Sequence, residues 1–423
     1  MKNVNIDYLT RVEGKGGLDL TIKDGEVRDL KLRIYEEPRF FEAFMVGRRF
    51  DEIAEIASRI CGICYVTHQI TPVRAIEKIL GVEVNDRIKL LRRLIAIGGI
   101  ISSHALHVYL LALPDVLKLP NSFSIDPKLL VKALKLKGLG DKIVEIVGGR
   151  AVHPVTIVVG GFTYAPPKEK LNALVDDLKD AKKTAMESIQ FFSSESLPSF
   201  EADSEKIALS NSDEYAINEG RVKSNKGLDI SEDEFRKFIE EEQVPHSTAK
   251  HSKVKGRLSY MVGPLSRVNL NFHQLNEDAQ NAAETSGFKF PSCNPFVANV
   301  ARVIEMISLI DEAIELIDLY NEGEVRVSFK VRGGNAAAIT EAPRGINYHW
   351  YSIDNNGVVK AADISPPTCQ NARRIEDDLR AYVPTIAELS KEEIAHRCSM
   401  LIRAYDPCIS CSVHSLNVKV RKT

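Results

Sequence analysis

The chain of 423 residues contains neither a long apolar run nor a marked excess of charge of one sign. No stretch reaches the roughly 18 uninterrupted apolar residues that cross a bilayer as a helix, so no direct membrane span is expected. The first residues, MKNVNIDYLTRVEG, lack the apolar core of a secretory signal. The formal charge of −2 gives no basic surface, so we expect no nucleic-acid partner. These absences predict a soluble, cytoplasmic protein.

Cysteine is scarce, and its seven copies are an odd number. Without a secretory signal, this predicts reduced thiols and metal ligation in place of a disulfide framework. Cys293, Cys369 and Cys398 stand alone and are expected to be small buried side chains. The other four cysteines form two CxxC pairs.

The two CxxC pairs lie near opposite ends of the chain, and each is followed by a histidine. The first is RICGICYVTH at residues 59–68, and the second is DPCISCSVH at residues 406–414. Together they offer four thiolates and two imidazoles. This donor set suits a soft transition metal.

Structural zinc is the first alternative for four thiolates. Zinc ribbons, however, close both pairs within a few tens of residues, because the metal replaces a core that so short a segment cannot build. Here the pairs bracket nearly the whole chain, which has 44% hydrophobic residues and can bury a core of its own. A zinc cage stays sterically possible, since the cost of loop closure grows only with the logarithm of length.

Both cysteine motifs resemble the two signatures of the catalytic (large) subunit of nickel–iron hydrogenases, in the bidirectional, sulfhydrogenase-like group. Four shorter stretches agree with that family: RVEG at residues 11–14, RFFE at residues 39–42, EAPRG at residues 341–345 and PTCQN at residues 367–371. The matches extend over essentially the whole chain. The resemblance implies an α+β, mainly helical fold with a core of long helices and small peripheral sheets.

The resemblance also implies one cooperative catalytic domain over residues 1–423. Its expected parts are an N-terminal hairpin at 17–36, a helical core at 40–190, a peripheral insertion at about 195–258, and C-terminal helices with the metal motif at 295–414. Residues 415–423, SLNVKVRKT, resemble an extension that a maturation endopeptidase removes.

Two local signals refine this division of the chain. Asn356-Gly357 predicts a second hairpin. Pro114 is expected to end a long apolar helix that begins at Ile88.

In the resembled family, four cysteines hold a nickel ion, and an iron that carries cyanide and carbon monoxide shares two of them. The resemblance implies that Cys61 and Cys408 are terminal nickel ligands and that Cys64 and Cys411 bridge nickel and iron. Thiolates are soft donors that stabilise several oxidation states of nickel.

The resemblance implies three catalytic groups. Heterolytic cleavage of H2 needs a base for the proton, and the thiolate of Cys408 can take it and pass it to a carboxylate. Glu13 matches the proton-relay glutamate of the family. Arg344 matches an arginine over the open metal position, where its permanent charge would polarise the substrate.

Further residues match groups that surround the centre in the family. His68 is expected to hydrogen-bond a bridging sulfur. Thr368 matches the donor to an iron-bound cyanide, and Pro343 lies in the matching EAPRG stretch. Glu42 and His414 match ligands of a separate structural ion, magnesium or iron.

One position departs from the family pattern. Many members carry an acidic residue before the histidine at position 104, whereas this chain has Ser103. We therefore expect Asp406 to be the carboxylate partner of Arg344. His104 and His107 are three positions apart and can share a metal, but satisfied core hydrogen bonds are the favoured interpretation.

The predicted activity is the reversible conversion of H2 to two protons and two electrons. The chain has no further cysteine cluster and no GxGxxG motif, so electrons must leave through an iron–sulfur small subunit. A flavin subunit that reduces NAD(P) is the expected next carrier. The alternatives are coupling to ferredoxin, coenzyme F420 or heterodisulfide reductase, a non-hydrogenase homologue from a complex I-like assembly, and a structural zinc protein.

Overall fold

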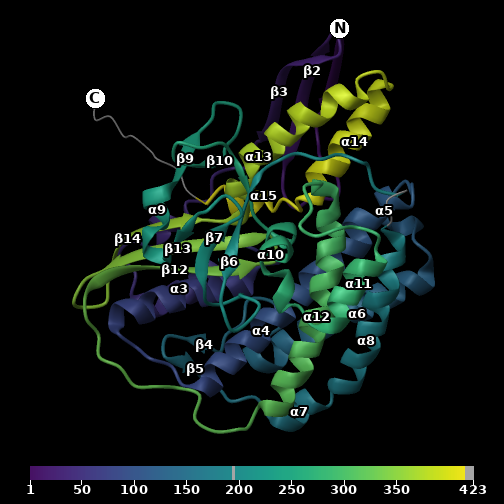
Figure 1. Cartoon of the computed structure of the whole chain (residues 1–423). Helices are drawn as coiled ribbons and strands as arrows, with labels where there is room; N and C mark the ends of the chain where they lie inside the picture. The colour runs from purple at the N-terminus through teal and green to yellow at the C-terminus, as the bar shows by residue number, and fades with distance from the viewer. Residues whose placement is uncertain (193–195, 415–423) are drawn as a thin grey trace, which may run out of the picture.

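The computed structural model describes residues 1–192 and 196–414, and the extension predicted at residues 415–423 lies outside them. Long helices form one side of the molecule, and small sheets cover the other side and the end near the N-terminus (Figure 1). The predicted α+β, mainly helical class is therefore confirmed.

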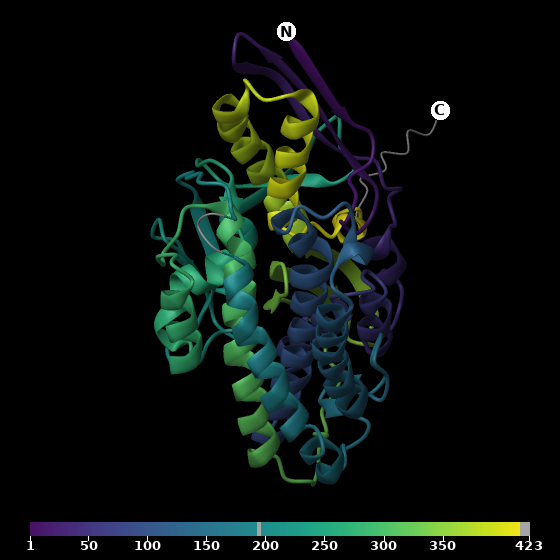
Figure 2. The same cartoon turned by 90° about the vertical axis from the view of Figure 1, so that its right-hand side faces the viewer.

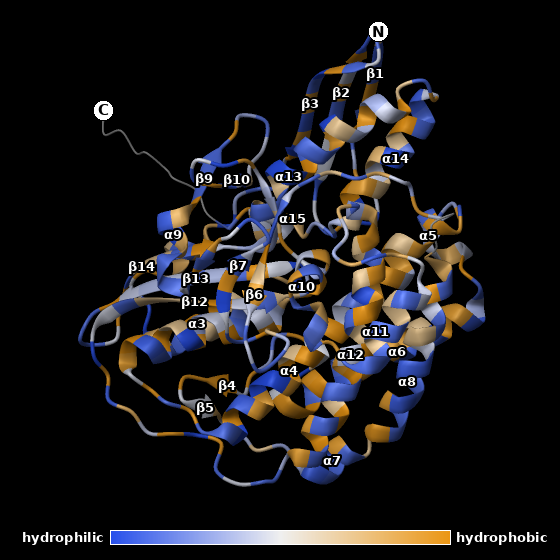
Figure 3. Cartoon of the chain, viewed as in Figure 1, coloured by the Kyte–Doolittle hydropathy of each residue, from blue (hydrophilic) through white to orange (hydrophobic). Residues whose placement is uncertain are grey.

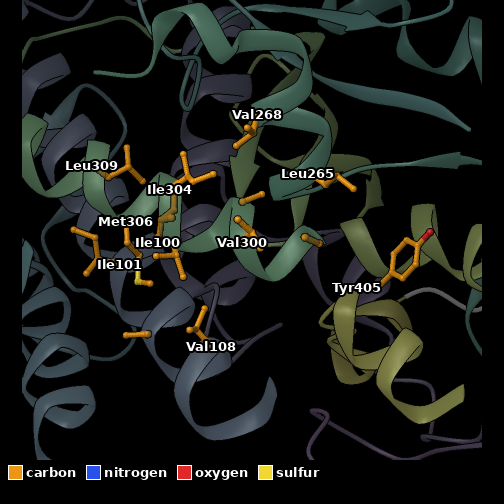
Figure 4. Close-up of a cluster of buried hydrophobic side chains, with 14 of the residues drawn as sticks. Ile100, Ile101, Val108, Leu265, Val268, Val300, Ile304, Met306, Leu309 and Tyr405 are labelled. Atoms are coloured by element: carbon orange, nitrogen blue, oxygen red, sulfur yellow. The ribbon is translucent and has the colours of Figure 1, made fainter. Parts of the chain in front are cut away.

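The helical core consists of four long segments that run side by side (Figure 2). They are α4 Asp86–Ala105, α6 Pro127–Gly148, α8 Val175–Ser188 and α12 Ala298–Leu319. Hydrophobic residues line α4 and α12 (Figure 3), and the buried side chains of these helices interlock in the largest core cluster (Figure 4).

Two glycines allow α4 and α6 to approach closely. A Cβ atom on Gly98 would lie 2.9 Å from the carbonyl oxygen of Gly140, and a Cβ atom on Gly140 would lie 2.5 Å from that of Gly98. Both distances are too short for a residue with a side chain at either position. The close approach of α4 and α6 therefore requires glycine at both positions.

The long apolar helix does not end at Pro114, contrary to our expectation. Its backbone widens to a π-helix over Leu106–Ala112 and then continues as α5, Leu113–Val116. Pro114 lies in the first turn of α5, where its missing N–H is not needed. The whole segment, Asp86–Val116, is long and apolar enough to cross a membrane, but 83% of its most apolar window is buried inside the protein, as in a core helix.

The N-terminal segment forms a sheet of three antiparallel strands. The strands are β1 Lys2–Ile6, β2 Gly16–Lys23 and β3 Glu26–Ile34. The turn at Asp24-Gly25 joins β2 to β3. Strand β1 was not predicted from the sequence.

A second three-stranded sheet crosses the middle of the molecule. It contains β12 Gly334–Ala342, β13 Gly345–Ile353 and β14 Val359–Ser365, all antiparallel. The hairpin predicted at Asn356-Gly357 joins β13 to β14 and is confirmed, whereas β12 was not predicted. Helix α3, Tyr65–Leu80, packs on β12 and β13.

The peripheral region holds short strands and a separate hairpin. A mixed sheet contains β6 Glu205–Ser210, β7 Arg221–Ser224, β8 Asp229–Ile230 and β11 Tyr260–Met261. The hairpin of β9 Ile239–Gln243 and β10 Lys250–Val254 packs on α13, Pro367–Tyr382.

The remaining elements are short, apart from α14. They are α1 Phe41–Met45, α2 Ile53–Ser58, β4 Ile157–Val158, β5 Gly161–Phe162, α7 Lys168–Asn172, α9 Phe235–Phe238, α10 Pro264–Asn271, α11 Glu277–Thr285, α14 Lys391–Ala404 and α15 Ile409–Ser412.

The two ends of the chain meet around α15. The N–H of Ile409 donates to the carbonyl of Glu13 at 2.9 Å, and the N–H of Arg39 donates to the carbonyl of Val413 at 2.8 Å. These contacts bring the C-terminal CxxC pair into the interior, beside the first.

Candidate metal centre

The four cysteines of the CxxC pairs meet in one buried cluster. Cys61 lies in the loop before α3, and Cys64 is the residue that precedes the helix. Cys408 precedes α15, and Cys411 lies within it. Their sulfur atoms lie within 4.8 Å of one another, so loops from opposite ends of the chain build one site.

Short sulfur–sulfur distances define this cluster. The sulfur of Cys408 lies 3.5 Å from that of Cys61 and 2.7 Å from that of Cys411, and Cys64 lies 3.6 Å from Cys411. The backbone N–H groups of Ile63 and Cys64 donate to the sulfur of Cys61 at 3.2 and 3.1 Å. Hydrogen bonds from Cys408 and Cys411 lower the pKa of the Cys64 thiol, which favours the thiolate that a metal needs.

Arg344 supplies the positive charge beside the sulfurs. Its Nε donates to the backbone carbonyl of Asp406 at 2.7 Å, and its Nη2 donates to the carboxylate at 3.0 Å. Burial opposes its charge, but Asp406 and the thiolates of Cys408, Cys64 and Cys61 raise the pKa of Arg344. The buried Nη1 has no hydrogen-bond partner among the described residues, so it is free for a group bound at the centre.

Four thiolates, backbone donors and one unpartnered guanidinium nitrogen fit a bimetallic nickel–iron centre. Four soft sulfur donors match these metals. Burial raises the pKa of the Cys411 thiol, so all four sulfurs become thiolates only when cations balance their charge. When bound, the centre would supply redox chemistry and an open position for H2.

Asp406 lies in a strained position that aims its carboxylate at Arg344, the partner expected from the sequence. Its φ of 53° is in the left-handed region, directly before Pro407. Nδ1 of His107 lies 3.0 Å from the same carboxylate oxygen. Burial opposes ionisation, but Arg344 and His107 outweigh it and lower the pKa of Asp406. Ser103 has a buried hydroxyl with no partner in the described chain.

Glu13 reaches the cluster from the N-terminal segment. Its Oε2 lies 3.1 Å from the sulfur of Cys408 and accepts a hydrogen bond from the N–H of Ser410 at 3.0 Å. Gly14, with a φ of 90°, permits this approach, because a Cβ atom there would lie 2.7 Å from the Cβ of Ile409. The RVEG stretch therefore carries both the carboxylate and the space it requires.

Thr368 and Pro343 also lie around the centre. The hydroxyl of Thr368 accepts a hydrogen bond from the N–H of Cys408 at 2.9 Å, so its own proton is free to donate elsewhere. The carbonyl of Pro343 accepts from Nη2 of Arg267 at 3.2 Å. This bond holds the loop that precedes Arg344.

The expected hydrogen bond from His68 to a sulfur is not formed. Nδ1 of His68 lies 3.2 Å from Nε2 of His349, and the buried Nε2 of His68 has no partner among residues that the structure describes. Nδ1 of His349 in turn lies 2.7 Å from the hydroxyl of Tyr351. The contact with His349 on β13 sets the orientation of the His68 ring, and the spacing of Cys64 and His68 along the chain could not predict it.

Glu42 and His414 form a second polar site nearby. Oε1 of Glu42 lies 3.6 Å from Nε2 of His414, and Nε2 lies 2.6 Å from the carbonyl of Ile364. Nδ1 of His414 lies 3.0 Å from the carbonyl of Cys411. Burial raises the pKa of Glu42 to about 7 and lowers that of His414 to about 4. A neutral imidazole has one N–H, so His414 cannot donate to the carbonyls of both Cys411 and Ile364. A cation bound by the Glu42 carboxylate, the Ile364 carbonyl and Nε2 of His414 would give each of these groups a partner.

Sequence reasoning missed the buried residues behind the centre. His349 is one, and Arg302 is another: it is fully buried on α12 and donates to Asn299 and to the carbonyl of Ala404, each at 3.0 Å. Charged residues on a helix normally indicate a solvent-exposed face. No signal in the sequence marks these as internal.

The single cysteines stay outside the cluster. Cys369 and Cys398 are fully buried, as predicted, and Cys293 is only partly buried. Burial raises the pKa of Cys398 to about 12, which keeps its thiol neutral.

Comparisons with known proteins agree with this geometry. A family model described as nickel-dependent hydrogenase matches residues 39–132 and 229–414. Sulfhydrogenase 1 subunit alpha of Pyrococcus furiosus is 37% identical over 98% of this chain and 99% of its own length. Sulfhydrogenase 2 subunit alpha of the same organism is 35% identical over 97% and 98%. A crystal structure of an NAD+-reducing [NiFe]-hydrogenase in the H2-reduced state superimposes with a TM-score of 0.87 and 26% identity, covering 98% of this chain and 100% of that one.

Proposed function

Because the chain belongs to the nickel-dependent hydrogenase family, we propose that its four clustered cysteines hold the nickel–iron centre and that Glu13, Arg344 and Cys408 handle the substrate. The chain is the catalytic subunit of a nickel–iron hydrogenase, an oxidoreductase that acts on H2. The observation that carries the assignment of the site is the convergence of four buried sulfurs within 4.8 Å.

In this proposal Cys61 and Cys408 would hold nickel, and Cys64 and Cys411 would serve both nickel and iron. Two sulfur–sulfur contacts connect the two CxxC pairs: Cys61 with Cys408, and Cys64 with Cys411. Each metal position therefore draws ligands from both ends of the chain. This arrangement would hold the loop of Cys408 and Cys411 in place when the centre is assembled.

The proton released from H2 is taken by the sulfur of Cys408 and passed to Glu13. The separation of 3.1 Å between these atoms is a direct hydrogen-bonding distance, so no water is needed between them. The N–H of Ser410 holds the carboxylate in position. Thr368, beside the N–H of Cys408, is the proposed donor to an iron-bound cyanide.

Arg344 acts as a fixed positive charge in this proposal. A guanidinium does not lose its proton at neutral pH, and Asp406 holds it through two hydrogen bonds. Its unpartnered Nη1 is available to polarise H2 at the open position. Glu42 and His414 would hold a structural magnesium or iron ion.

The relatives are alpha subunits of hydrogenases with several subunits, which supports a small-subunit partner for this chain. We propose that iron–sulfur clusters on this partner carry the electrons to a flavin subunit that reduces NAD(P). This acceptor matches the NAD+-reducing structural relative, so coupling to ferredoxin, coenzyme F420 or heterodisulfide reductase is not favoured. A maturation endopeptidase acting at residues 415–423 and a cytoplasmic location complete the proposal.

Metal analysis of the purified complex tests the site. We expect about one nickel per chain in the natural complex. Cys411→Ser should lose this nickel and about one iron, since a bridging thiolate serves both metals, and should keep the iron of the partner's clusters. Cys293→Ser, which changes a cysteine outside the cluster, should keep both metals and full H2 uptake. Zinc alone in the natural protein, or normal H2 uptake by Cys411→Ser, would contradict the assignment.

A further inference from the structure

A second group of metal-binding side chains lies away from the four cysteines. His246 is in the turn between β9 and β10, His251 is the second residue of β10, and Glu376 is on α13. One ligand atom from each lies within 4.8 Å of the others. The group therefore lies where the peripheral hairpin meets α13.

Glu376 is held in position to receive a cation. Its Oε1 accepts hydrogen bonds from the backbone N–H of Leu32 at 2.8 Å and from Nε2 of His246 at 2.8 Å. Its side chain is largely buried, whereas 20% of the His246 side chain is exposed. The carboxylate is fixed from inside the fold, and solvent reaches the site from the side of His246.

His251 supplies an observation that a simple histidine–glutamate hydrogen bond does not explain. The residue is only 2% exposed, and its Nε2 has no hydrogen-bond partner in the described residues. A buried polar atom without a partner is costly, and this cost is removed when the atom binds a metal ion. Its ring packs edge to face with that of His246, with ring centroids 5.7 Å apart.

The charges around the group permit a cation. In addition to burial, the positive charge of Arg373 on α13 contributes to lowering the pKa of His251. The guanidinium of Arg373 is paired with the carboxylate of Glu242 on β9. Glu376 therefore remains the carboxylate available to the two imidazoles.

We propose that His246, His251 and Glu376 form a zinc site distinct from the nickel–iron centre. Two imidazole nitrogens and one carboxylate oxygen are the donors that zinc accepts in three-ligand sites, with water at the fourth position. Bonds of about 2.0–2.2 Å in a tetrahedron separate the donors by about 3.3–3.6 Å. The site reaches this geometry when the contact between His246 and Glu376 opens slightly and His251 moves inward.

The ion would clamp the β9–β10 hairpin to α13. The hairpin is already tied to the N-terminal sheet, since the N–H of Thr248 donates to the carbonyl of Ile34 at 2.8 Å. The first turn of α13 carries Thr368, which contacts Cys408. Zinc would thus support the helix that positions the C-terminal cysteine pair, without entering the reaction.

Zinc analysis of the assembled, nickel-loaded complex tests this inference. Because nickel and iron then occupy the four thiolates, added ZnCl2 reports on the remaining donors. We expect about one zinc per chain, an X-ray absorption spectrum with only nitrogen and oxygen at about 2.0–2.2 Å, and a rise of a few degrees in melting temperature. Magnesium chloride at the same concentration should give no rise in melting temperature that depends on His246 or Glu376.

His246→Gln and Glu376→Gln should each weaken zinc binding at least about 10-fold to 100-fold and abolish the rise in melting temperature. His273→Gln, at an exposed position elsewhere, is the matched control and should bind zinc as the natural protein does. Sulfur ligands in the zinc spectrum, or equal zinc affinity in all four proteins, would overturn the inference. Nickel content and H2 uptake, measured in parallel, report on the hydrogenase site separately.

Discussion

The carboxylate of Glu13 lies 3.1 Å from the sulfur of Cys408, although 395 positions separate the two residues in the chain. The backbones of the same residues form an isolated parallel bridge, which the N–H of Ile409 closes by donating to the carbonyl of Glu13. The proton acceptor and the metal ligand are therefore held together by main-chain contacts as well as by their side chains. Substitution of either side chain should leave this connection in place.

Glu13→Gln should reduce H2 uptake by about 100-fold to 10,000-fold, because an amide keeps the shape of the side chain but cannot accept and release the proton. Nickel and iron contents should stay at the level of the natural protein, because Glu13 is not a metal ligand. Both quantities are measured on the same purified complex.

Glu37→Gln is the control for this change, because its carboxylate is exposed and pairs only with Lys15 in the described structure. It should leave H2 uptake unaltered. Normal turnover in Glu13→Gln would exclude the relay.

Arg344→Lys should lower kcat by about 100-fold to 1,000-fold with little loss of metal. A lysine keeps the positive charge but has a single nitrogen in place of the planar guanidinium. It therefore cannot replace Nε and Nη2, which donate to Asp406, and also the unpartnered Nη1. Steady-state H2 oxidation measures the effect.

Arg397→Lys provides the comparison, since it changes a partly exposed arginine that pairs with Glu393. It should retain full activity. If Arg344→Lys also oxidised H2 at the normal rate, a positive charge alone would be sufficient for activity, and Nη1 of Arg344 would have no specific role.

Much of the candidate site could be predicted from the sequence because its motifs resemble those of a known family, and some of them also carry their own geometry. A CxxC pair places two sulfurs on one loop, and RVEG combines a carboxylate with the glycine whose φ of 90° the close contact to Ile409 requires. The pairing of Asp406 with Arg344 was expected because this chain has Ser103 where many members of the resembled family have an acidic residue.

What could not be predicted depends on contacts between distant segments. His68 on α3 contacts His349 on β13, and α3 packs on both β13 and its unpredicted neighbour β12. The long helix continues past Pro114 through a π-helical segment that contacts α12. Neither effect has a local signal in the sequence.

Glu42→Gln should remove the second ion and lower the melting temperature by a few degrees. The amide loses the negative charge that a hard divalent cation requires. Magnesium and iron analysis before and after mild chelation, together with thermal unfolding, measures the change.

Glu52→Gln, a partly exposed carboxylate outside this site, is the control and should behave as the natural protein does. Equal ion content in Glu42→Gln and the natural protein would show that the ion does not depend on this carboxylate.

His104 should make the protein less stable in mild acid. Its imidazole is fully buried, and Nε2 lies 2.8 Å from Glu305. Burial lowers the pKa of His104 to about 4, against an ordinary value of 6.5, so the unfolded chain binds more protons than the folded one between these values. Stability must then rise with pH across this window. At pH 5 the lost stability is roughly 2 kcal/mol relative to pH 7.5.

His104→Gln should remove this part of the acid sensitivity, because its amide N–H can still donate to Glu305 but does not titrate. The melting temperature of the complex, measured at pH 7.5 and pH 5, should therefore fall less on acidification in His104→Gln than in the natural protein. His273→Gln changes an exposed histidine and should retain the full fall. An equal fall in all three proteins would mean that His104 is already protonated when folded, with Glu305 stabilising its charge more than burial opposes it.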